Sequence, residues 1–202
     1  MSFVLDDAQN TGKRLFPEAG AQYRDAKLVL FRNAVSSGCG MAQSATDPFY
    51  CPSDSKVYID LGFYDELKQR FGVSGNFAQA YVLAHEIGHH VQNLVGINNQ
   101  VRQAQRANPG VANELSVRLE LQANCLAAVR AHSTNQRNLL ERGDLDQSLT
   151  AAAAIGDDRL QKMATGQVRP ECFTHGTSQQ RAQWLQQGYD NPTMTACNTI
   201  AR

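Results

Sequence analysis

The chain has 202 residues, a length typical of one domain and sufficient to bury a core without help from metals or disulfides. Hydrophobic residues make up 42% of it, which excludes wholesale disorder, and 19 basic against 19 acidic residues exclude a general electrostatic attraction to nucleic acid or to anionic membranes. No apolar run approaches the roughly 20 residues of a membrane span. We therefore expect a single domain over residues 1–202 that binds no nucleic acid and does not itself insert into a membrane.

The first third of the chain combines strand and helix patterns. A short apolar run at residues 28–31 and an alternating pattern at residues 57–61 predict two strands, and residues 48–52 are expected to pair with one of them. A helix follows, in which large apolar residues recur at helical spacing until Gly72 ends it: Phe63, Leu67 and Phe71. This part of the chain thus predicts a small sheet followed by a helix.

After Gly72 the pattern is almost wholly helical. Residues 76–94 are apolar on nearly every face, which predicts a central, buried helix. Three further helices are predicted at residues 111–131, 144–163 and 177–188. Asp144 and Gln147 form a variant capping box at the start of the second of these three. A few strands followed by several helices indicate an α+β fold.

The predicted central helix contains the sequence His85-Glu86-Ile87-Gly88-His89. Two histidines four residues apart project from the same side of a helix, so both rings can bind one metal ion. Zinc accepts imidazole nitrogens, and a catalytic zinc site adds a third protein ligand while the fourth position stays open to water. Glu86 is placed to take a proton from that water and to hand it to the leaving amine. Gly88 leaves room for another part of the chain to approach closely.

The third ligand is expected from the helix that follows the histidines. Glu120 lies in an apolar neighbourhood, where a buried carboxylate needs a partner such as a zinc ion. Asn124 is one turn further along the same side, and we expect it to reach a ligating imidazole from behind. The sequence therefore predicts one catalytic Zn²⁺ held by His85, His89 and Glu120.

The five cysteines favour disulfide bonds. Cys39 and Cys51 bracket a short irregular segment, and we expect a bridge between them. Cys197 can pair with Cys172 or with Cys125, and the spacing does not decide between the two. Disulfides need an oxidising compartment, whereas the N-terminus has no basic start followed by an apolar stretch. We therefore expect an extracytoplasmic protein, periplasmic, secreted or membrane-anchored, whose given sequence starts downstream of a removed segment.

Several motifs together resemble those of the bacterial neutral zinc metallopeptidase family. They are the stretches His85–Leu94 and Glu120–Cys125, together with Gly38-Cys39-Gly40, Pro48-Phe49-Tyr50-Cys51-Pro52, Ile155-Gly156-Asp157-Asp158-Arg159 and Phe173-Thr174-His175-Gly176. The resemblance runs from about residue 28 to the C-terminus. It implies a zincin-like fold, one catalytic zinc and a peptidase activity on peptide or protein substrates. Members of this family often carry an N-terminal membrane anchor.

One residue departs from the family pattern. Where Asn124 stands, members usually have aspartate, which would accept a hydrogen bond from a ligand histidine and make it more basic. Losing such an outer-shell partner typically costs roughly 10- to 100-fold in metal affinity or activity. The departure keeps open an alternative function, a catalytically impaired zinc-binding or partner-binding protein on the same fold. The intact Glu86 favours the enzyme, with an activity that Asn124 reduces.

Two further expectations concern substrate and transition state. A zinc peptidase needs a donor for the oxygen that becomes negative opposite the metal, and His175 is our candidate, with Arg181 as the other residue that can supply it. Zincins usually bind substrate as an additional strand along a sheet edge. The predicted strand at residues 57–61 is our candidate for that edge.

Overall fold

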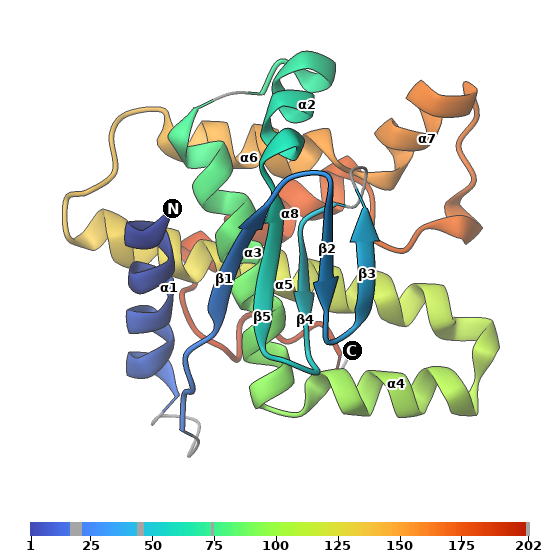
Figure 1. Ribbon diagram of the computed structural model, residues 1–202, viewed down its shortest axis with the longest axis horizontal. Coiled ribbons are helices and arrows are strands. Elements are labelled where there is room, and N and C mark those ends of the chain that lie inside the picture. Colours follow the sequence, from blue (N-terminus) through green and yellow to red (C-terminus); the bar gives the residue numbers. More distant parts are fainter. Residues whose placement is uncertain (17–21, 44–46, 74, 201–202) are drawn as a thin grey trace.

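The computed structural model describes residues 1–16, 22–43, 47–73 and 75–200, and it has the predicted α+β architecture. Five short strands precede most of the helices (Figure 1). The strands are β1 (Lys27–Phe31), β2 (Ala34–Ser37), β3 (Gly40–Gln43), β4 (Phe49–Cys51) and β5 (Lys56–Asp60). The α-helices are α1 (Ser2–Leu15), α2 (Leu61–Phe71), α3 (Asn76–Leu94), α4 (Ile97–Ala107), α5 (Ala112–Gln136), α6 (Asp144–Ala154), α7 (Asp157–Thr165) and α8 (Ser178–Asp190).

The main sheet has three strands in the order β1-β5-β4. β5 pairs in parallel with β1 and antiparallel with β4, which confirms that residues 48–52 pair with a predicted strand. The choice of residues 57–61 as the sheet edge is wrong. β5 lies in the middle of the sheet, and residues Val57 to Asp60 are buried because neighbours cover the strand on both sides. Among the described strands, β4 forms the edge away from β1.

Helix α3 is the central helix of the fold, as its apolar pattern predicts. It lies behind the strands in Figure 1, and α5 crosses behind it. Leu83 and Ile87 pack on the sheet against Val57 and Ile59, whereas the opposite side of α3 packs on α5. Because both sides are covered by protein, a polar side chain on α3 must find a partner within the fold.

Two glycines allow helices to cross at short distance on α5. A Cβ atom at Gly88 of α3 would lie 2.9 Å from the carbonyl oxygen of Ala123, so only glycine permits this approach of α3 to α5. A Cβ atom at Gly188 of α8 would lie 2.1 Å from the carbonyl oxygen of Cys125. The predicted helix end at Gly188 is therefore wrong: α8 continues to Asp190, and the glycine serves packing.

The predicted helix over residues 144–163 is also wrong, because the chain forms two helices there. Gly156 adopts an extended conformation between α6 and α7, and the backbone N–H of Asp157 donates to the carbonyl of Gly176 (2.9 Å). Asp144 does not cap α6, since Gly143 precedes that helix and the Asp144 carboxylate accepts from the backbone of Glu141 (2.6 Å). Helices α1 and α4 lie outside the predicted elements.

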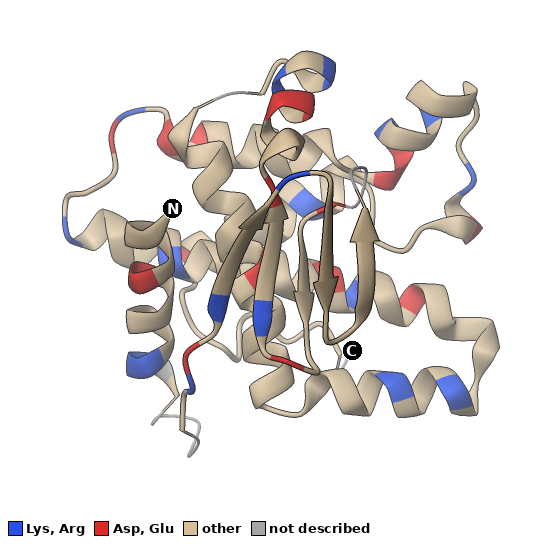
Figure 2. Cartoon of the chain, viewed as in Figure 1, with Lys and Arg blue, Asp and Glu red and all other residues tan. Residues whose placement is uncertain are grey.

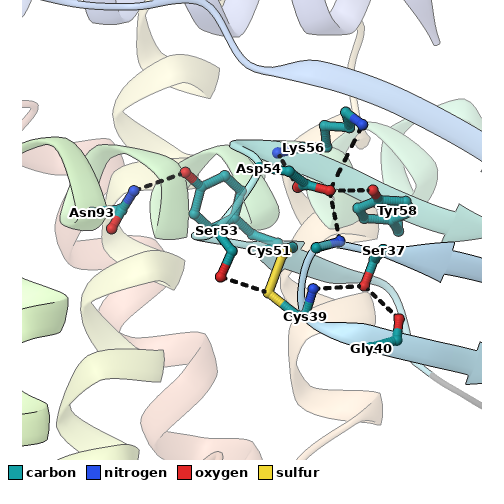
Figure 3. Close-up of a disulfide and its surroundings, with 11 residues drawn as sticks. Ser37, Cys39, Gly40, Cys51, Ser53, Asp54, Lys56, Tyr58 and Asn93 are labelled. Carbon is teal, nitrogen blue, oxygen red and sulfur yellow. Dashed lines mark hydrogen bonds and ion pairs between the residues drawn. A yellow bond between two sulfur atoms is a disulfide. The ribbon is translucent and has the colours of Figure 1, made fainter.

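Two disulfides bind irregular segments to this framework. The expected bridge Cys39–Cys51 is confirmed, and next to it the Asp54 carboxylate accepts from the Tyr58 hydroxyl (2.5 Å; Figure 3). Cys197 pairs with Cys125 of α5, and Cys172 is a free, exposed thiol.

Acidic and basic residues are interspersed over the helices and loops (Figure 2). No helix in the described part of the chain is long and apolar enough to cross a membrane.

Helix α1 is anchored on α5 through a buried carboxylate. The Asp7 side chain, 3% exposed, accepts from the guanidinium of Arg130 (2.7 Å), from Arg137 and from the Thr134 hydroxyl (2.9 Å). Burial alone would raise the pKa of Asp7, but Arg130, Arg137 and Thr134 lower it below its ordinary value of 3.8. Asp7 therefore stabilises the fold while it is ionised, and this contribution disappears as pH falls through its lowered pKa.

We expect Asp7→Asn to lower the free energy of unfolding by about 3 kcal/mol near pH 7, because Arg130 is left buried without its counter-charge. The difference from the wild type should shrink as the pH falls through the lowered pKa of Asp7, where the wild-type carboxylate is itself being protonated. Urea denaturation over a series of pH values from 7 downwards measures it, with the exposed neighbour Asp6→Asn as control. An Asp7→Asn penalty that stays constant with pH would contradict this account.

Candidate metal centre

The side chains of His85, His89 and Glu120 meet where α3 crosses α5. The Nε2 atom of His85 lies 3.1 Å from Glu120 Oε2, and the Nε2 atom of His89 lies 3.2 Å from Glu120 Oε1. One ligand atom from each residue falls within 4.8 Å of the others. The three predicted ligands are thus brought together by two helices, one turn of α3 supplying both rings and α5 supplying the carboxylate.

This donor set fits a zinc ion. Zn–N and Zn–O bonds of about 2.0–2.2 Å in a tetrahedral shell place ligand atoms roughly 3.3 Å apart. The observed separations of 3.1 and 3.2 Å between the ring nitrogens and the carboxylate oxygens are close to that value. The side chains of His85, His89 and Glu120 are 8%, 15% and 18% exposed, so the group is reachable from one side. His85, His89 and Glu120 would therefore hold zinc and leave a position open.

The electrostatics of the three side chains also suit a cation. Burial lowers the pKa of His85 to about 4, so this ring is a neutral donor. Burial by itself would lower the pKa of His89 as well, but the charge of Glu120 outweighs it and raises the pKa to about 9. Burial would raise the pKa of Glu120, yet the two rings hold it well below its ordinary value. The carboxylate is thus ionised, and positive charge is favoured beside it.

Glu86 follows His85 on α3 and is 5% exposed. Burial raises the pKa of its carboxyl to about 8, against the opposing effects of His89 and of a hydrogen bond from the backbone of Tyr50. A carboxyl group with a pKa near neutrality can both accept and return a proton under physiological conditions. Glu86 lines the same cleft as the three predicted ligands but is not one of the metal-binding group.

The site opens into a cleft of about 720 Å³. The edge strand β4 contributes Phe49 and Tyr50 to its wall. Half-buried apolar side chains from α2, α7 and the segment before α7 line one part: Phe63, Phe71, Ile155 and Leu160. Polar side chains from α4 and α5 line another part: Asn98, Arg102, Gln105 and Ser116. The lining of the cleft therefore offers both apolar and polar contacts to a ligand.

His175 lies in the wall of this cleft, and Asp157 fixes its position. The Asp157 carboxylate accepts from the backbone N–H groups of Thr174 (2.8 Å), His175 (2.7 Å) and Gly176 (3.0 Å), and it lies 3.2 Å from His175 Nδ1. This hydrogen bond raises the pKa of His175 and favours its charged form. The ring is half exposed, so a ligand in the cleft can reach it.

Arg181, the other candidate donor, also lines the cleft. It is 2% exposed, and its guanidinium donates to the Tyr81 hydroxyl (3.1 Å) and to the carbonyl of Ala152 (3.1 Å). Its Nη1 atom lies 3.7 Å from Glu120 Oε2. Arg181 is thus positioned to hold the Glu120 carboxylate and to keep it ionised.

Asn124 does not make the hydrogen bond expected of it. Its Oδ1 atom accepts from the Tyr81 hydroxyl (2.5 Å), and its Nδ2 atom has no hydrogen-bond partner among the described residues. The Nδ1 atom of His85 is also buried and has no hydrogen-bond partner among the described residues. Asn124 is fully buried on α5, but the Tyr81 hydroxyl rather than a ligand ring occupies its oxygen.

The residue behind a predicted ligand is Gln92, which the sequence analysis missed. Its Oε1 atom lies 2.8 Å from Nδ1 of His89. The signal was available, because Gln92 lies three residues after His89 on the same helix and side chains at that spacing are neighbours. His90 points elsewhere, to the Tyr50 hydroxyl (2.9 Å) and the carbonyl of Arg24 (2.6 Å).

Comparisons with known proteins agree with this geometry. A family model described as "Putative neutral zinc metallopeptidase" matches residues 1–200. The uncharacterized protein YpfJ of Escherichia coli (strain K12) is 50% identical over 202 residues, which are 100% of this chain and 70% of the relative. The uncharacterized protein Mb2605 of Mycobacterium bovis is 43% identical over 190 residues, 89% of this chain and 64% of the relative. No solved structure matches the chain significantly.

We expect Glu120→Ala to weaken zinc binding by more than about 100-fold, because losing a direct ligand should exceed the cost of losing an outer-shell partner. Competition with a chromophoric chelator measures the zinc Kd and the stoichiometry, which should be one ion per chain in the wild type. Glu114→Ala is the matched control, since Glu114 lies on the same helix and pairs with Arg118 in solvent. Unchanged zinc affinity in Glu120→Ala would contradict the assignment.

Proposed function

Because the chain belongs to the neutral zinc metallopeptidase family, we propose that it is a zinc-dependent peptidase with a zincin-like fold that hydrolyses peptide bonds in peptide or protein substrates. The observation that carries this proposal is the convergence of a zinc-compatible donor set and a buried glutamate of raised pKa in one open cleft. One catalytic Zn²⁺, held by His85, His89 and Glu120, completes the site.

The bound zinc would polarise the substrate carbonyl and lower the pKa of the attacking water. Glu86 accepts the proton that this water loses as its oxygen bonds to the carbonyl carbon. The same carboxyl then donates that proton to the amine nitrogen as the C–N bond breaks, so that it ends the cycle ionised. The environment that raises the pKa of Glu86 to about 8 supports both halves of this transfer.

His175 supplies the donor for the oxygen that becomes negative. Its backbone and one ring nitrogen are held by Asp157, so the ring is positioned before substrate arrives. The raised pKa of His175 favours the charged form, whose N–H donates more strongly to a negative oxygen than a neutral ring does. Donors held in place before the reaction need no reorganisation when charge develops.

The substrate backbone adds to β4. Within the described chain this strand pairs with β5 alone, and two of its residues face the cleft. Pairing along β4 would carry the substrate past Glu86, whose carboxyl accepts from the backbone of Tyr50 on the same strand. The bulky apolar part of the cleft, lined by Phe63 and Phe71, then receives a large apolar substrate side chain.

Two disulfides in a chain of this size favour an oxidising compartment, and we place the activity outside the cytoplasm. The Cys39–Cys51 bridge ends on the last residue of β4 and ties the strand that lines the cleft to the β2–β3 turn (Figure 3). The oxidised form therefore stabilises the edge to which substrate is proposed to bind.

Glu86→Gln should keep the zinc affinity of the wild type and lose about 10²- to 10⁴-fold in turnover, because it removes proton transfer and leaves the metal ligands intact. Casein or a quenched peptide mixture serves as substrate, and zinc content is measured on the same samples. Glu141→Gln, in an exposed loop, is the control. Zinc binding without turnover in the wild type would instead favour the binding protein that Asn124 suggests.

Phe63→Ala should lower kcat/KM for peptides with Leu or Phe next to the cleaved bond by about 10- to 100-fold, while peptides with Ala there change less. Cleavage-site profiling of a peptide library measures the change in preference. Leu139→Ala, which removes an apolar side chain that is 48% exposed, should leave the profile unchanged. A uniform loss for all peptides in Phe63→Ala would contradict the apolar subsite.

A further inference from the structure

The predicted ligand His89 is oriented by a chain of hydrogen bonds that ends at the C-terminal segment. Its Nε2 atom faces Glu120 (3.2 Å), and its Nδ1 atom faces Oε1 of Gln92 (2.8 Å). An amide oxygen can only accept, so when His89 gives up its second proton to bind a metal, the remaining proton lies on Nδ1. The lone pair of Nε2 is then directed towards the predicted metal position.

The orientation of Gln92 is itself determined by the backbone. Its Nε2 group donates to the carbonyl of Leu119 (2.7 Å) and to Oε1 of Gln122 (3.0 Å). A carbonyl cannot donate, so the amide nitrogen of Gln92 must face Leu119 and its oxygen must face His89. Turning the amide over would place two acceptors against each other at Leu119.

Gln122 extends the chain by one more step. Its Nε2 group donates to the backbone carbonyl of Cys197 (3.1 Å), which fixes its oxygen towards Gln92. Gln92 and Cys197 are fully buried and Gln122 is 3% exposed. With so little exposure, a polar group that loses its partner in this chain of hydrogen bonds is left buried and unpaired.

The last acceptor is held by a covalent bond. Cys197 lies beyond α8, and its disulfide with Cys125 joins the C-terminal segment to α5. Two residues on, the Thr199 hydroxyl donates to the carbonyl of Arg118 (2.6 Å), so the segment follows α5. Cys125 and Gln122 are neighbours on the helix that also carries Glu120. The bridge therefore holds the Cys197 carbonyl beside the helix that provides the third predicted ligand.

We propose that Gln92 and Gln122 are positioning residues for His89, and that the Cys125–Cys197 disulfide holds their final anchor. The inference rests on the metal centre of the proposed function but not on peptidase activity. His85 has no such support, because its Nδ1 atom lacks a partner among the described residues. The geometry of the metal centre thus depends on the hydrogen bonds that orient His89. The C-terminal segment supports the site through these bonds although it contributes no ligand.

Variants at Gln92 separate positioning from packing. Gln92→Leu keeps the shape of the side chain without an acceptor and should weaken zinc binding about 10- to 100-fold. Gln92→Glu keeps an acceptor for Nδ1–H but loses the donor to Leu119 and Gln122, so it should retain more zinc affinity than Gln92→Leu, whereas a packing role would tolerate leucine better than a buried carboxylate. Asn93→Leu, at the next residue and bonded to Tyr50 instead, is the control. Zinc Kd values and the visible spectrum of the Co²⁺-substituted protein are the readouts.

Removing each disulfide in turn tests whether Cys125–Cys197 holds the last acceptor of this chain of hydrogen bonds. Removing Cys125–Cys197 by two Cys→Ser substitutions should weaken zinc binding by up to about tenfold, and removing Cys39–Cys51 in the same way should not change it. If the first double variant does not fold, Gln122→Leu takes its place with the same expected loss. Equal zinc affinity and equal Co²⁺ spectra in the wild type and Gln92→Leu would overturn the proposal that Gln92 positions His89. A wild type that binds no metal would overturn the metal centre as well, and metal binding without turnover would affect the peptidase alone.

Discussion

The structure depends on the close crossing of α3 and α5 at Gly88. Because no side chain separates the two backbones there, the ring nitrogens of His85 and His89 come within 3.2 Å of the Glu120 carboxylate. Three polar groups in such a buried place are costly unless each has a partner. In this fold the three side chains contact one another, and one divalent ion could bind all three at once. If α3 and α5 lay farther apart, one ion could not reach all three side chains, and each would be a buried polar group without a partner.

The rest of the fold holds this crossing and opens it on one side. The sheet covers one side of α3 and the helix α8 packs closely on α5, so the two ligand-bearing helices cannot move apart without disturbing the core. Arg181 adds a buried positive charge 3.7 Å from Glu120, and Asp157 fixes His175 at the cleft wall. The same elements therefore stabilise the fold and hold the candidate metal site. The edge strand β4 borders the cleft.

Local spacing in the sequence predicts the cluster that the structure brings together. His85 and His89 share one side of a helical turn, and the apolar neighbours of Glu120 indicate a buried carboxylate, so periodicity and residue type are enough to predict that these three side chains meet. Sequence patterns fail where the outcome depends on distant partners. The place of β5 in the sheet depends on β1 and β4, the break at Gly156 depends on the carbonyl of Gly176, and the role of Gly188 depends on Cys125. Asn124 lies on α5 as expected, but its oxygen accepts from the hydroxyl of Tyr81 on α3, a contact that spacing along α5 does not predict.

Zinc K-edge X-ray absorption on the purified, zinc-loaded protein would show directly which atoms surround the metal. A site built from His85, His89 and Glu120 predicts four light-atom ligands at about 2.0–2.2 Å, two of them with the multiple-scattering pattern of imidazole. A shell that contains sulfur at about 2.3 Å, or one without imidazole, would contradict it.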